Sequence, residues 1–397
     1  MTGGRLFSAS EEEIRRGYTT DVYFGRTKRI LEARGNGGTE VWAEVTGSSL
    51  PRDWDWAVYC GLEEVLRLAE GYPIDMYSVP EGTVFRVRSS NSVRIPLMNI
   101  HGVYSGFGVI ETPLLGMLCQ PSGVATCAAR TKMAAGGKSV TAFGNRRMHP
   151  SISGVLDRSA FIGGCDAVSS RMGGDITETE PLGTTPHALM LVMGSNEAAF
   201  RSFDEIIEPE VPRIMLIDTF SDERTGAMDA CRSVKDLTGV RLDTPGSRRG
   251  NFKEIIDEVR WELDINGYGN VGIMVSGGLD EESVAALSGT CVTGFGVGTS
   301  ISNAPTLDLS MDIVERKGEP VSKRGKFGGR KYAYRCPDCL CMDAALSPSV
   351  SIVCACGCEM DMIEEKVLEN GKRISKPRSA KEIRKNVLEQ LEIISEL

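Results

Sequence analysis

The sequence predicts an α/β protein built around an irregular, incomplete α/β barrel, with an α+β region before it and a small metal-binding module after it. Two observations indicate the barrel and its neighbour. Short apolar runs alternate with helical patterns through the middle of the chain, which is typical of a parallel sheet with helical crossovers. The first hundred residues instead mix helical and strand patterns. The third observation is the crowding of six of the twelve cysteines into residues 336–358, which predicts the module.

We expect four parts along the chain. Residues 1–108 form the N-terminal α+β domain, and residues 109–300 form the barrel. Residues 301–330 contain the nearly alternating run Leu307–Val314, which predicts an antiparallel strand returning to the N-terminal sheet. The basic, glycine-rich segment 317–331 after it reads as a mobile linker. Residues 331–397 form the cysteine-rich module with a terminal amphipathic helix.

The barrel is predicted from a small number of strands. Six are clear and a seventh is possible, which falls short of the eight of a regular barrel. We therefore expect an incomplete or irregular one. The six candidate strands are Ser139–Phe143, Ala167–Ser169, Arg213–Asp218, Gly239–Asp243, Val271–Val275 and Cys291–Phe295.

Composition limits the classes of partner. The net charge of −9 argues against broad, sequence-independent nucleic-acid binding, which needs a basic surface. No apolar run approaches the roughly 20 residues of a membrane span, and the first residues lack an apolar signal core. We therefore expect a cytoplasmic protein with no membrane partner.

Two glycine-rich loops in tandem, within Val271–Ser300, are the strongest sign of ligand binding. Each follows a predicted buried strand: Ser276-Gly277-Gly278 after the first, and Gly296-Val297-Gly298-Thr299 after the second. Glycines after a strand let backbone N–H groups approach an anion, and the last two loops of many barrels bind phosphate in this way. Asp280 is the expected N-cap of the next helix.

Charged side chains follow other predicted barrel strands. Arg146 and Arg147 come after the first strand, and paired guanidinium groups suit phosphate or pyrophosphate. Asp218 and Asp243 each end a strand, where carboxylates hold Mg²⁺ or sugar hydroxyls. His187 opens a helix after Gly183-Thr184-Thr185-Pro186 and is a candidate for proton or phosphoryl transfer. Each of these also has an ordinary structural reading, as a solvated turn, an N-cap or a packed histidine.

The cysteine spacing predicts a structural zinc site. Cys336 and Cys339 lie on a CPxC turn, and Cys356 precedes Gly357, the glycine usual in such turns. Cys354 is the expected fourth ligand, while Cys358 and Cys341 remain alternatives. Four thiolates with no open position and no nearby histidine indicate a structural Zn²⁺.

In order, these segments resemble nicotinate phosphoribosyltransferase of the archaeal type. The resemblance runs over about residues 18–330 and implies an irregular seven-stranded barrel joined to an α/β sandwich domain. It rests on nine pieces: TDVYF (20–24), PSGVAT (121–126), FGNRR (143–147), GGCDAVSS (163–170), GTTPH (183–187), LIDTF (216–220), RLDT (241–244), SGGLDEE (276–282) and GFGVGTS (294–300).

The resemblance implies a reaction. The family transfers a phosphoribosyl group from phosphoribosyl pyrophosphate to nicotinate, which yields nicotinate mononucleotide and pyrophosphate in NAD salvage. It further implies homodimers or larger homo-oligomers whose active sites are shared between subunits, with Tyr23 of a second subunit against the nicotinate ring and Arg241 near its carboxylate. By the same resemblance His187 is the histidine that is phosphorylated where ATP hydrolysis is coupled to the transfer. The alternatives are a related quinolinate or nicotinamide enzyme and, more remotely, a non-catalytic zinc-ribbon protein that binds nucleic acid or protein.

Overall fold

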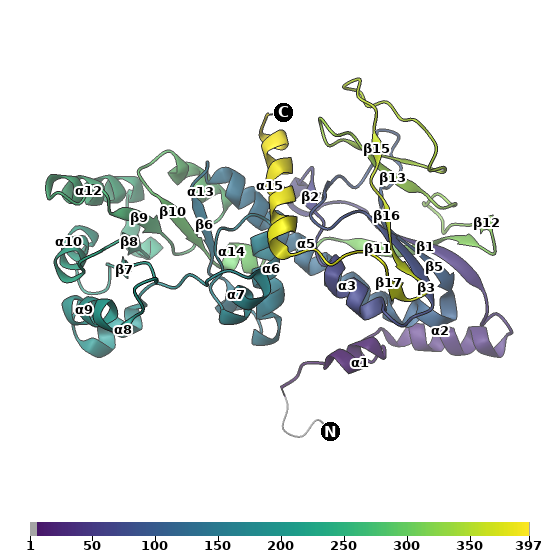
Figure 1. The fold of residues 1–397 in the computed structure, drawn as a ribbon, viewed down its shortest axis with the longest axis horizontal. Helices are drawn as coiled ribbons and strands as arrows, with labels where there is room; N and C mark the ends of the chain where they lie inside the picture. The colour runs from purple at the N-terminus through teal and green to yellow at the C-terminus, as the bar shows by residue number, and fades with distance from the viewer. Residues whose placement is uncertain (1–5, 397) are drawn as a thin grey trace. The chain divides into compact units, whose positions relative to one another are not determined.

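The computed structural model describes residues 6–396, which form two compact units. The described residues up to Thr126, together with those from Pro305 onward, make one unit, here called the terminal unit. The middle unit is Cys127–Ala304. Figure 1 draws both units with their helices and strands labelled. Among the described residues no helix has the length and apolar character needed to cross a membrane.

A seven-stranded sheet forms the core of the terminal unit, in the order β12-β11-β1-β5-β3-β16-β17. Within it, β1 pairs antiparallel with both β5 and β11, so that Val45 lies opposite both Met98 and Met311. The run 307–314 thus supplies the returning antiparallel strand that its alternation predicts. The strands are β1 (Glu40–Gly47), β3 (Ile74–Ser78), β5 (Pro96–Val103), β11 (Leu309–Arg316), β12 (Glu319–Pro320), β16 (Glu365–Glu369) and β17 (Lys372–Arg373).

Three cations of the basic segment after β11, Lys326, Arg330 and Lys331, are not free on the surface, while the mobility expected of the segment as a linker stays a prediction. Lys326 Nζ lies 2.6 Å from Asp312, and both side chains are only 6% exposed. Lys331 Nζ lies 2.9 Å from the buried Glu44. Arg330 is stacked among aromatic rings, the nearest being that of Trp42. Burying a cation is costly unless it is paired, so these contacts hold the segment against the sheet.

The cysteine-rich segment has its own small sheet, in the order β14-β13-β15. The chain then leaves it, because β16 pairs with β3 in the large sheet. The terminal helix α15 (Ala380–Glu396) is fixed by the buried Gln390, whose amide accepts from Val84 N and donates to Gly82 O. The small-sheet strands are β13 (Tyr332–Arg335), β14 (Met342–Ala345) and β15 (Asp361–Met362).

The remaining elements of the terminal unit cover the large sheet or connect its strands. The longest helix, α5 (Glu111–Ala134), continues through Pro121. Pro121 has no N–H for the carbonyl of Met117, and the backbone of Gly61 packs against that carbonyl. The other elements are α1 (Glu11–Arg15), α2 (Val22–Ala33), α3 (Leu62–Ala69), α4 (Tyr104–Phe107), β2 (Ala57–Val58), β4 (Val84–Phe85) and the 3₁₀ turns Pro51–Asp53 and Gly108–Ile110.

A parallel sheet in the order β6-β10-β9-β8-β7 forms the core of the middle unit. Five of the six predicted strands appear, and the sixth is reduced to one bridge between Ala167 and Thr141. The last strand begins three residues later than expected and includes Gly296. The strands are β6 (Ser139–Ala142), β7 (Ile214–Leu216), β8 (Gly239–Leu242), β9 (Gly272–Val275) and β10 (Gly294–Val297).

Helices follow the strands of this sheet, as expected for parallel pairing. Beyond the sheet edges, Leu182 N donates to Val168 O, and Leu216 N donates to the hydroxyl of the buried Thr185. Closure of the sheet into an irregular barrel stays a prediction. The helices are α6 (Ser153–Ile162), α7 (Arg171–Thr177), α8 (His187–Met193), α9 (Asn196–Ile206), α10 (Glu223–Ser233), α11 (Gly246–Arg249), α12 (Phe252–Ile265), α13 (Glu281–Ser288) and α14 (Thr299–Ser302), with 3₁₀ turns at Asn145–Arg147 and Pro150–Ile152.

Candidate active site

A pocket of about 340 Å³ lies where the loops after β6, β8, β9 and β10 meet. The carboxyl ends of parallel strands share one edge of a sheet, so loops far apart in sequence come together there. Ten of the residues predicted for the site line this pocket: Arg146, Arg147, Arg241, Asp243, Ser276, Gly277, Gly278, Gly296, Gly298 and Thr299. Phe143, Asn145 and Ser169 complete its lining.

The loop after β9 has the backbone that its glycines predict. Gly277 and Gly278 have φ values of +88° and +68°, a region that other residues adopt at a cost. Neither N–H group donates to an acceptor in the part of the chain that the structure describes. Asp280 caps α13 by accepting from Ser283 N at 2.9 Å, as expected. The loop therefore presents N–H groups to the pocket.

Gly296, inside β10, and Gly298, just after this strand, have different roles. A Cβ on Gly296 would lie 2.5 Å from the ring of Phe143, so this glycine makes room for an aromatic side chain. Gly298 precedes Thr299 and the short helix α14, and its backbone lies beside the carbonyl of Phe143. In this second loop, Gly298 and Thr299 are thus better placed than Gly296 to approach a phosphate.

Arg146 and Arg147 are exposed on the 3₁₀ turn after β6. Their turn is held from behind by Asp157, which is 2% exposed on α6. The Asp157 carboxylate accepts from Asn145 Nδ2 at 2.8 Å and from Ser170 Oγ at 2.5 Å. Burial raises the pKa of Asp157, and these hydrogen bonds oppose the rise. Sequence reasoning missed Asp157, because a single acid within a helical pattern carries no signal of its own.

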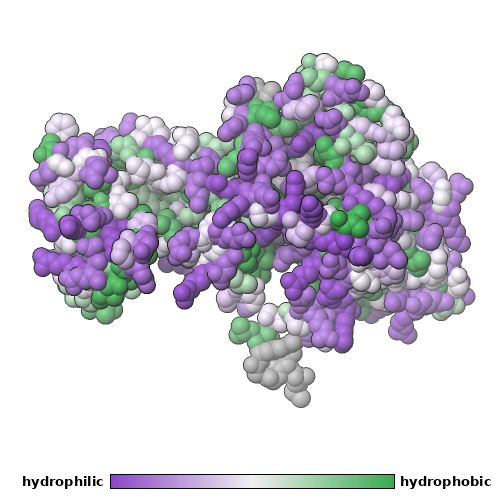
Figure 2. Space-filling model, in the orientation of Figure 1, coloured by the Kyte–Doolittle hydropathy of each residue, from purple (hydrophilic) through white to green (hydrophobic). Residues whose placement is uncertain are grey.

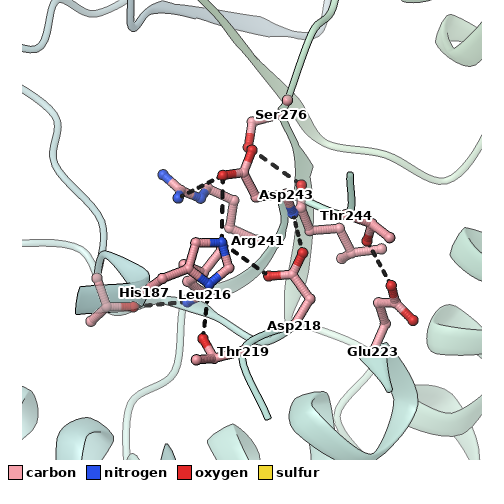
Figure 3. A network of polar contacts seen from close by, with 12 residues as sticks. His187, Leu216, Asp218, Thr219, Glu223, Arg241, Asp243, Thr244 and Ser276 are labelled. Carbon is pink, nitrogen blue, oxygen red and sulfur yellow. Dashed lines mark hydrogen bonds and ion pairs between the residues drawn. The ribbon is translucent and has the colours of Figure 1, made fainter. Parts of the chain in front are cut away.

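His187, Asp218 and Asp243 come together beside the pocket, as Figure 3 shows. His187 Nε2 lies 3.7 Å from Asp243 Oδ2 and 4.0 Å from Asp218 Oδ1. On the other side of the ring, Nδ1 lies 3.0 Å from the hydroxyl of Thr219. Asp218 is almost fully buried, and burial raises its pKa while His187 opposes the rise. The histidine is therefore oriented by one hydroxyl and faces two carboxylates.

Asp243 links this histidine to the phosphate-binding loop. Its Oδ1 accepts from Ser276 Oγ at 2.8 Å, and its Oδ2 lies 3.7 Å from Arg241 Nη2. Its backbone N–H donates to Asp218 at 2.9 Å. Arg241 lies over the ring of Phe143, and burial lowers its pKa while Asp243 and Asp218 oppose this. The predicted residues thus form one connected network.

The same carboxylates have the chemistry of a Mg²⁺ site. Asp218 Oδ1 is buried and has no hydrogen-bond partner among the described residues. Mg²⁺ is usually bound by one or two carboxylates together with substrate phosphates, and Asp243 supplies a second carboxylate that reaches the pocket. The residues present fit this ion.

The predicted zinc ligands meet in the small sheet. The sulfur atoms of Cys336, Cys339, Cys354 and Cys356 all lie within 4.8 Å of one another, and the described residues offer no other metal-binding cluster. Cys336 and Cys356 are 3.4 Å apart, and Cys339 lies 3.4 Å from Cys354 and 3.7 Å from Cys356. Tetrahedral Zn²⁺ with bonds of about 2.3 Å separates its sulfurs by about 3.8 Å, so the cluster fits this metal.

The two remaining cysteines lie outside this cluster. Cys358 donates to the Asp338 carboxylate at 2.6 Å, and Cys341 is not in the cluster. The choice of Cys354 over Cys358 therefore agrees with the geometry.

Tyr23 belongs to the terminal unit. It lies on α2 with 55% of its side chain exposed, and its ring packs against that of Phe24. The structure describes each unit by itself, so the role of Tyr23 at a substrate stays a prediction.

Family comparisons agree with this site. The quinolinate phosphoribosyl transferase N-terminal domain matches residues 21–122, and the C-terminal domain of that family matches residues 124–312. The second match contains the whole pocket. The fold and the site thus define the class, which is that of phosphoribosyltransferases with this pair of domains.

Individual relatives narrow the class. The crystal structure of nicotinate-nucleotide pyrophosphorylase from Pyrococcus furiosus is 47% identical, with a TM-score of 0.93 over 98% of this chain and 99% of that one. Nicotinate phosphoribosyltransferase pncB1 of Mycobacterium tuberculosis is 33% identical over 60% of this chain. The chain belongs to the nicotinate phosphoribosyltransferase family. It spans only 55% of the length of the M. tuberculosis relative.

A more distant structure shows the fold alone. Human nicotinic acid phosphoribosyltransferase is 19% identical, with a TM-score of 0.75 over 94% of both chains. The fold is therefore similar across nearly the whole chain at low identity.

Proposed function

We propose that this protein transfers the phosphoribosyl group of phosphoribosyl pyrophosphate to nicotinate. The bond between C1 of the ribose and the pyrophosphate oxygen breaks, and a bond from C1 to the pyridine nitrogen forms. The products are nicotinate mononucleotide and pyrophosphate, which places the reaction in NAD salvage. The observation that carries the proposal is the single pocket that joins two glycine loops to three arginines.

The two ends of the donor match different walls of this pocket. The N–H groups of Gly277 and Gly278, with the loop of Gly298 and Thr299, suit the 5-phosphate of the ribose. Arg146 and Arg147 suit the pyrophosphate, whose negative charge grows as the bond to C1 breaks. A protein with a net charge of −9 needs such a local group of cations to bind a polyanion.

Mg²⁺ would neutralise charge on the leaving pyrophosphate, and Asp218 and Asp243 would hold it. The chain itself positions these acids, because Ser276 Oγ donates to Asp243 and the backbone N–H of Asp243 donates to Asp218. As an alternative to Mg²⁺, the same two carboxylates would accept hydrogen bonds from the ribose hydroxyls. Arg241 approaches Asp243 from the side of Phe143, where a guanidinium can meet the nicotinate carboxylate.

The acceptor side is proposed to need a second subunit. Tyr23 is exposed and aromatic, which suits stacking on the pyridine ring of a nicotinate bound in the pocket of a neighbouring chain. Figure 2 shows apolar side chains gathered over α8 and α9, where Leu191, Val192 and Ile206 are exposed. Such a surface offers a place for contact between copies in a homodimer or larger homo-oligomer.

His187 is the proposed site of ATP coupling. If Nδ1–H donates to Thr219, the lone pair lies on Nε2, which faces Asp218 and Asp243. Nε2 is then free to accept a phosphoryl group from ATP, and the two carboxylates hold the ring as positive charge develops on it. The coupled form of the reaction is that of a ligase.

The zinc module and the location complete the proposal. Four cysteine sulfurs at tetrahedral separations support a structural Zn²⁺ that stabilises the small sheet. The Pyrococcus furiosus protein, whose chain is matched over 99% of its length, supports an enzyme of the archaeal type. We expect it to work in the cytoplasm.

Quinolinate is the second candidate acceptor, because the matching domain family is named for it. Its extra carboxylate calls for a further basic group, and the only cations lining the pocket within the described residues are Arg146, Arg147 and Arg241. Arg241 already lies beside Asp243. Nicotinamide, the third acceptor, is uncharged and would not need Arg241. The charges therefore favour nicotinate.

Identification of the products tests the proposal. Purified protein incubated with nicotinate, phosphoribosyl pyrophosphate and Mg²⁺ should form nicotinate mononucleotide and an equal amount of pyrophosphate, measured by mass spectrometry and ³¹P NMR. Arg147→Ala should lower this rate, while Arg232→Ala, at a surface arginine on α10, should leave it unchanged. Hydrolysis of the donor without a nucleotide product would refute the proposal.

A further inference from the structure

Arg249, at the end of α11, connects the loop after β8 to the phosphate-binding loop after β9. Its Nε donates to Thr244 O at 2.7 Å. Its Nη2 donates to Ser276 O at 2.9 Å and also to Gly277 O. The side chain does not line the pocket; its guanidinium carbon lies 4.6 Å from the centre of the Phe252 ring. Arg249 therefore contacts the backbone of the site from outside.

The two carbonyl groups that accept hydrogen bonds from Arg249 Nη2 determine where the N–H groups of the loop point. In a planar trans peptide, the C=O of one residue and the N–H of the next point in opposite directions. Ser276 O and Gly277 O both point to Arg249, so the N–H groups of Gly277 and Gly278 point away from it. These are the N–H groups that Gly277 and Gly278 present where they line the pocket.

The shape of the arginine head group is needed for this arrangement. A guanidinium is planar and donates from several nitrogens at fixed angles, so one side chain reaches carbonyls of two loops at once. The space is also closed to a side chain at position 277, since a Cβ there would lie 2.9 Å from both Arg249 Nη2 and Asp243 Oδ1. Glycine at 277 and arginine at 249 thus fit each other.

We propose that Arg249 is a positioning residue that orients the N–H groups of Gly277 and Gly278 toward the 5-phosphate of the ribosyl donor. The inference rests on the proposed function, because it assigns that loop to the donor's phosphate. Arg249 does not touch the donor; it acts through the carbonyls of the loop. Its positive charge behind the loop also favours an anion in front of it.

Calorimetric titration with ribose 5-phosphate tests the proposal without requiring turnover. Arg249→Ala should weaken ribose 5-phosphate binding about 10- to 100-fold, the effect of losing hydrogen bonds from a charged donor. Arg248→Ala removes the same charge from the neighbouring exposed position and should change the affinity less than about twofold. In steady-state assays, the KM for phosphoribosyl pyrophosphate should rise with Arg249→Ala while the KM for nicotinate stays constant.

Rescue distinguishes positioning from a general loss of structure. Added methylguanidinium should restore part of the ribose 5-phosphate affinity to Arg249→Ala and leave Arg248→Ala unchanged. If Arg249→Ala does not fold, Arg249→Lys provides the comparison. This variant should bind ribose 5-phosphate more weakly than wild type, because one ammonium group cannot reproduce the planar set of donors of a guanidinium. Wild-type affinity in the variant that folds would overturn the proposal.

The two proposals can fail separately. Protein that binds ribose 5-phosphate in an Arg249-dependent way but does not use nicotinate would refute the proposed acceptor and support the role of Arg249. Wild-type protein that uses nicotinate but does not bind ribose 5-phosphate would overturn the assignment of the loop and of Arg249 with it.

Discussion

Gly277 and Gly278 are neighbours that both adopt positive φ, yet substitution by alanine should affect them differently. Any alanine in this region costs about 1–2 kcal/mol through contact between Cβ and the backbone. At position 278 the new Cβ meets nothing within 4 Å, so this is the whole expected loss. At position 277 the Cβ would lie 2.9 Å from Arg249 Nη2 and from Asp243 Oδ1, which adds about 1–3 kcal/mol of overpacking.

Urea denaturation of the two variants measures this difference. Gly277→Ala should lose about 1–3 kcal/mol more free energy of unfolding than Gly278→Ala. In an Arg249→Ala background this excess should shrink, because one of the two groups that meet the Cβ is gone. Equal losses for the two single variants would refute the described packing of Arg249 behind the loop.

Three further predictions concern other parts of the chain. His187→Ala should abolish any gain in turnover or yield on adding ATP while leaving the ATP-independent transfer measurable; a gain that survives in the variant would contradict the coupling role. Removal of zinc by a chelator should speed hydrogen exchange in residues 332–362 while α15 stays protected, because Gln390 on that helix is hydrogen-bonded to Val84 N and Gly82 O, outside the small sheet; an unchanged small sheet would argue against a structural metal. Burial, aided by Asp312 and Asp21 and opposed by Lys323, raises the pKa of Glu111 from 4.5 to about 7. The folded state then holds a proton that the unfolded state loses, so stability should fall as pH rises from about 4.5 to about 7. Glu111→Gln should flatten that fall in denaturation curves, and an unchanged slope would exclude Glu111 as its cause.

Much of the site could be predicted because its signals are local. The glycine pair Gly277-Gly278 after an apolar run predicts a loop that follows a strand, and the CPxC sequence at Cys336 predicts a metal-binding turn. The parallel sheet then brings such loops to one edge whatever lies between them in sequence. This shared edge of the parallel strands, more than any single motif, explains why ten predicted residues line one pocket.

What could not be predicted depends on contacts between distant segments. The pairing of Lys326 with Asp312 follows from how the chain returns along the large sheet, so composition alone suggested a free basic segment. Gly296 looked like a phosphate-loop glycine, yet it makes room for Phe143 from another strand. Arg249 carries no motif, and its role appears only when the loop it holds is folded against it.

The central claim is that nicotinate is the acceptor, and the ratio of kcat/KM for nicotinate to that for quinolinate tests it most directly. Both acids are measured with phosphoribosyl pyrophosphate and Mg²⁺ at saturating donor, and nicotinamide serves as the uncharged comparison. Arg241 lies beside Asp243, and within the described residues only Arg146 and Arg147, assigned to the pyrophosphate, line the pocket as further cations. Nicotinate should therefore be used at least about tenfold better than either, a difference of about 1.4 kcal/mol in transition-state binding. Equal use of the acceptors, or preference for quinolinate, would contradict the account.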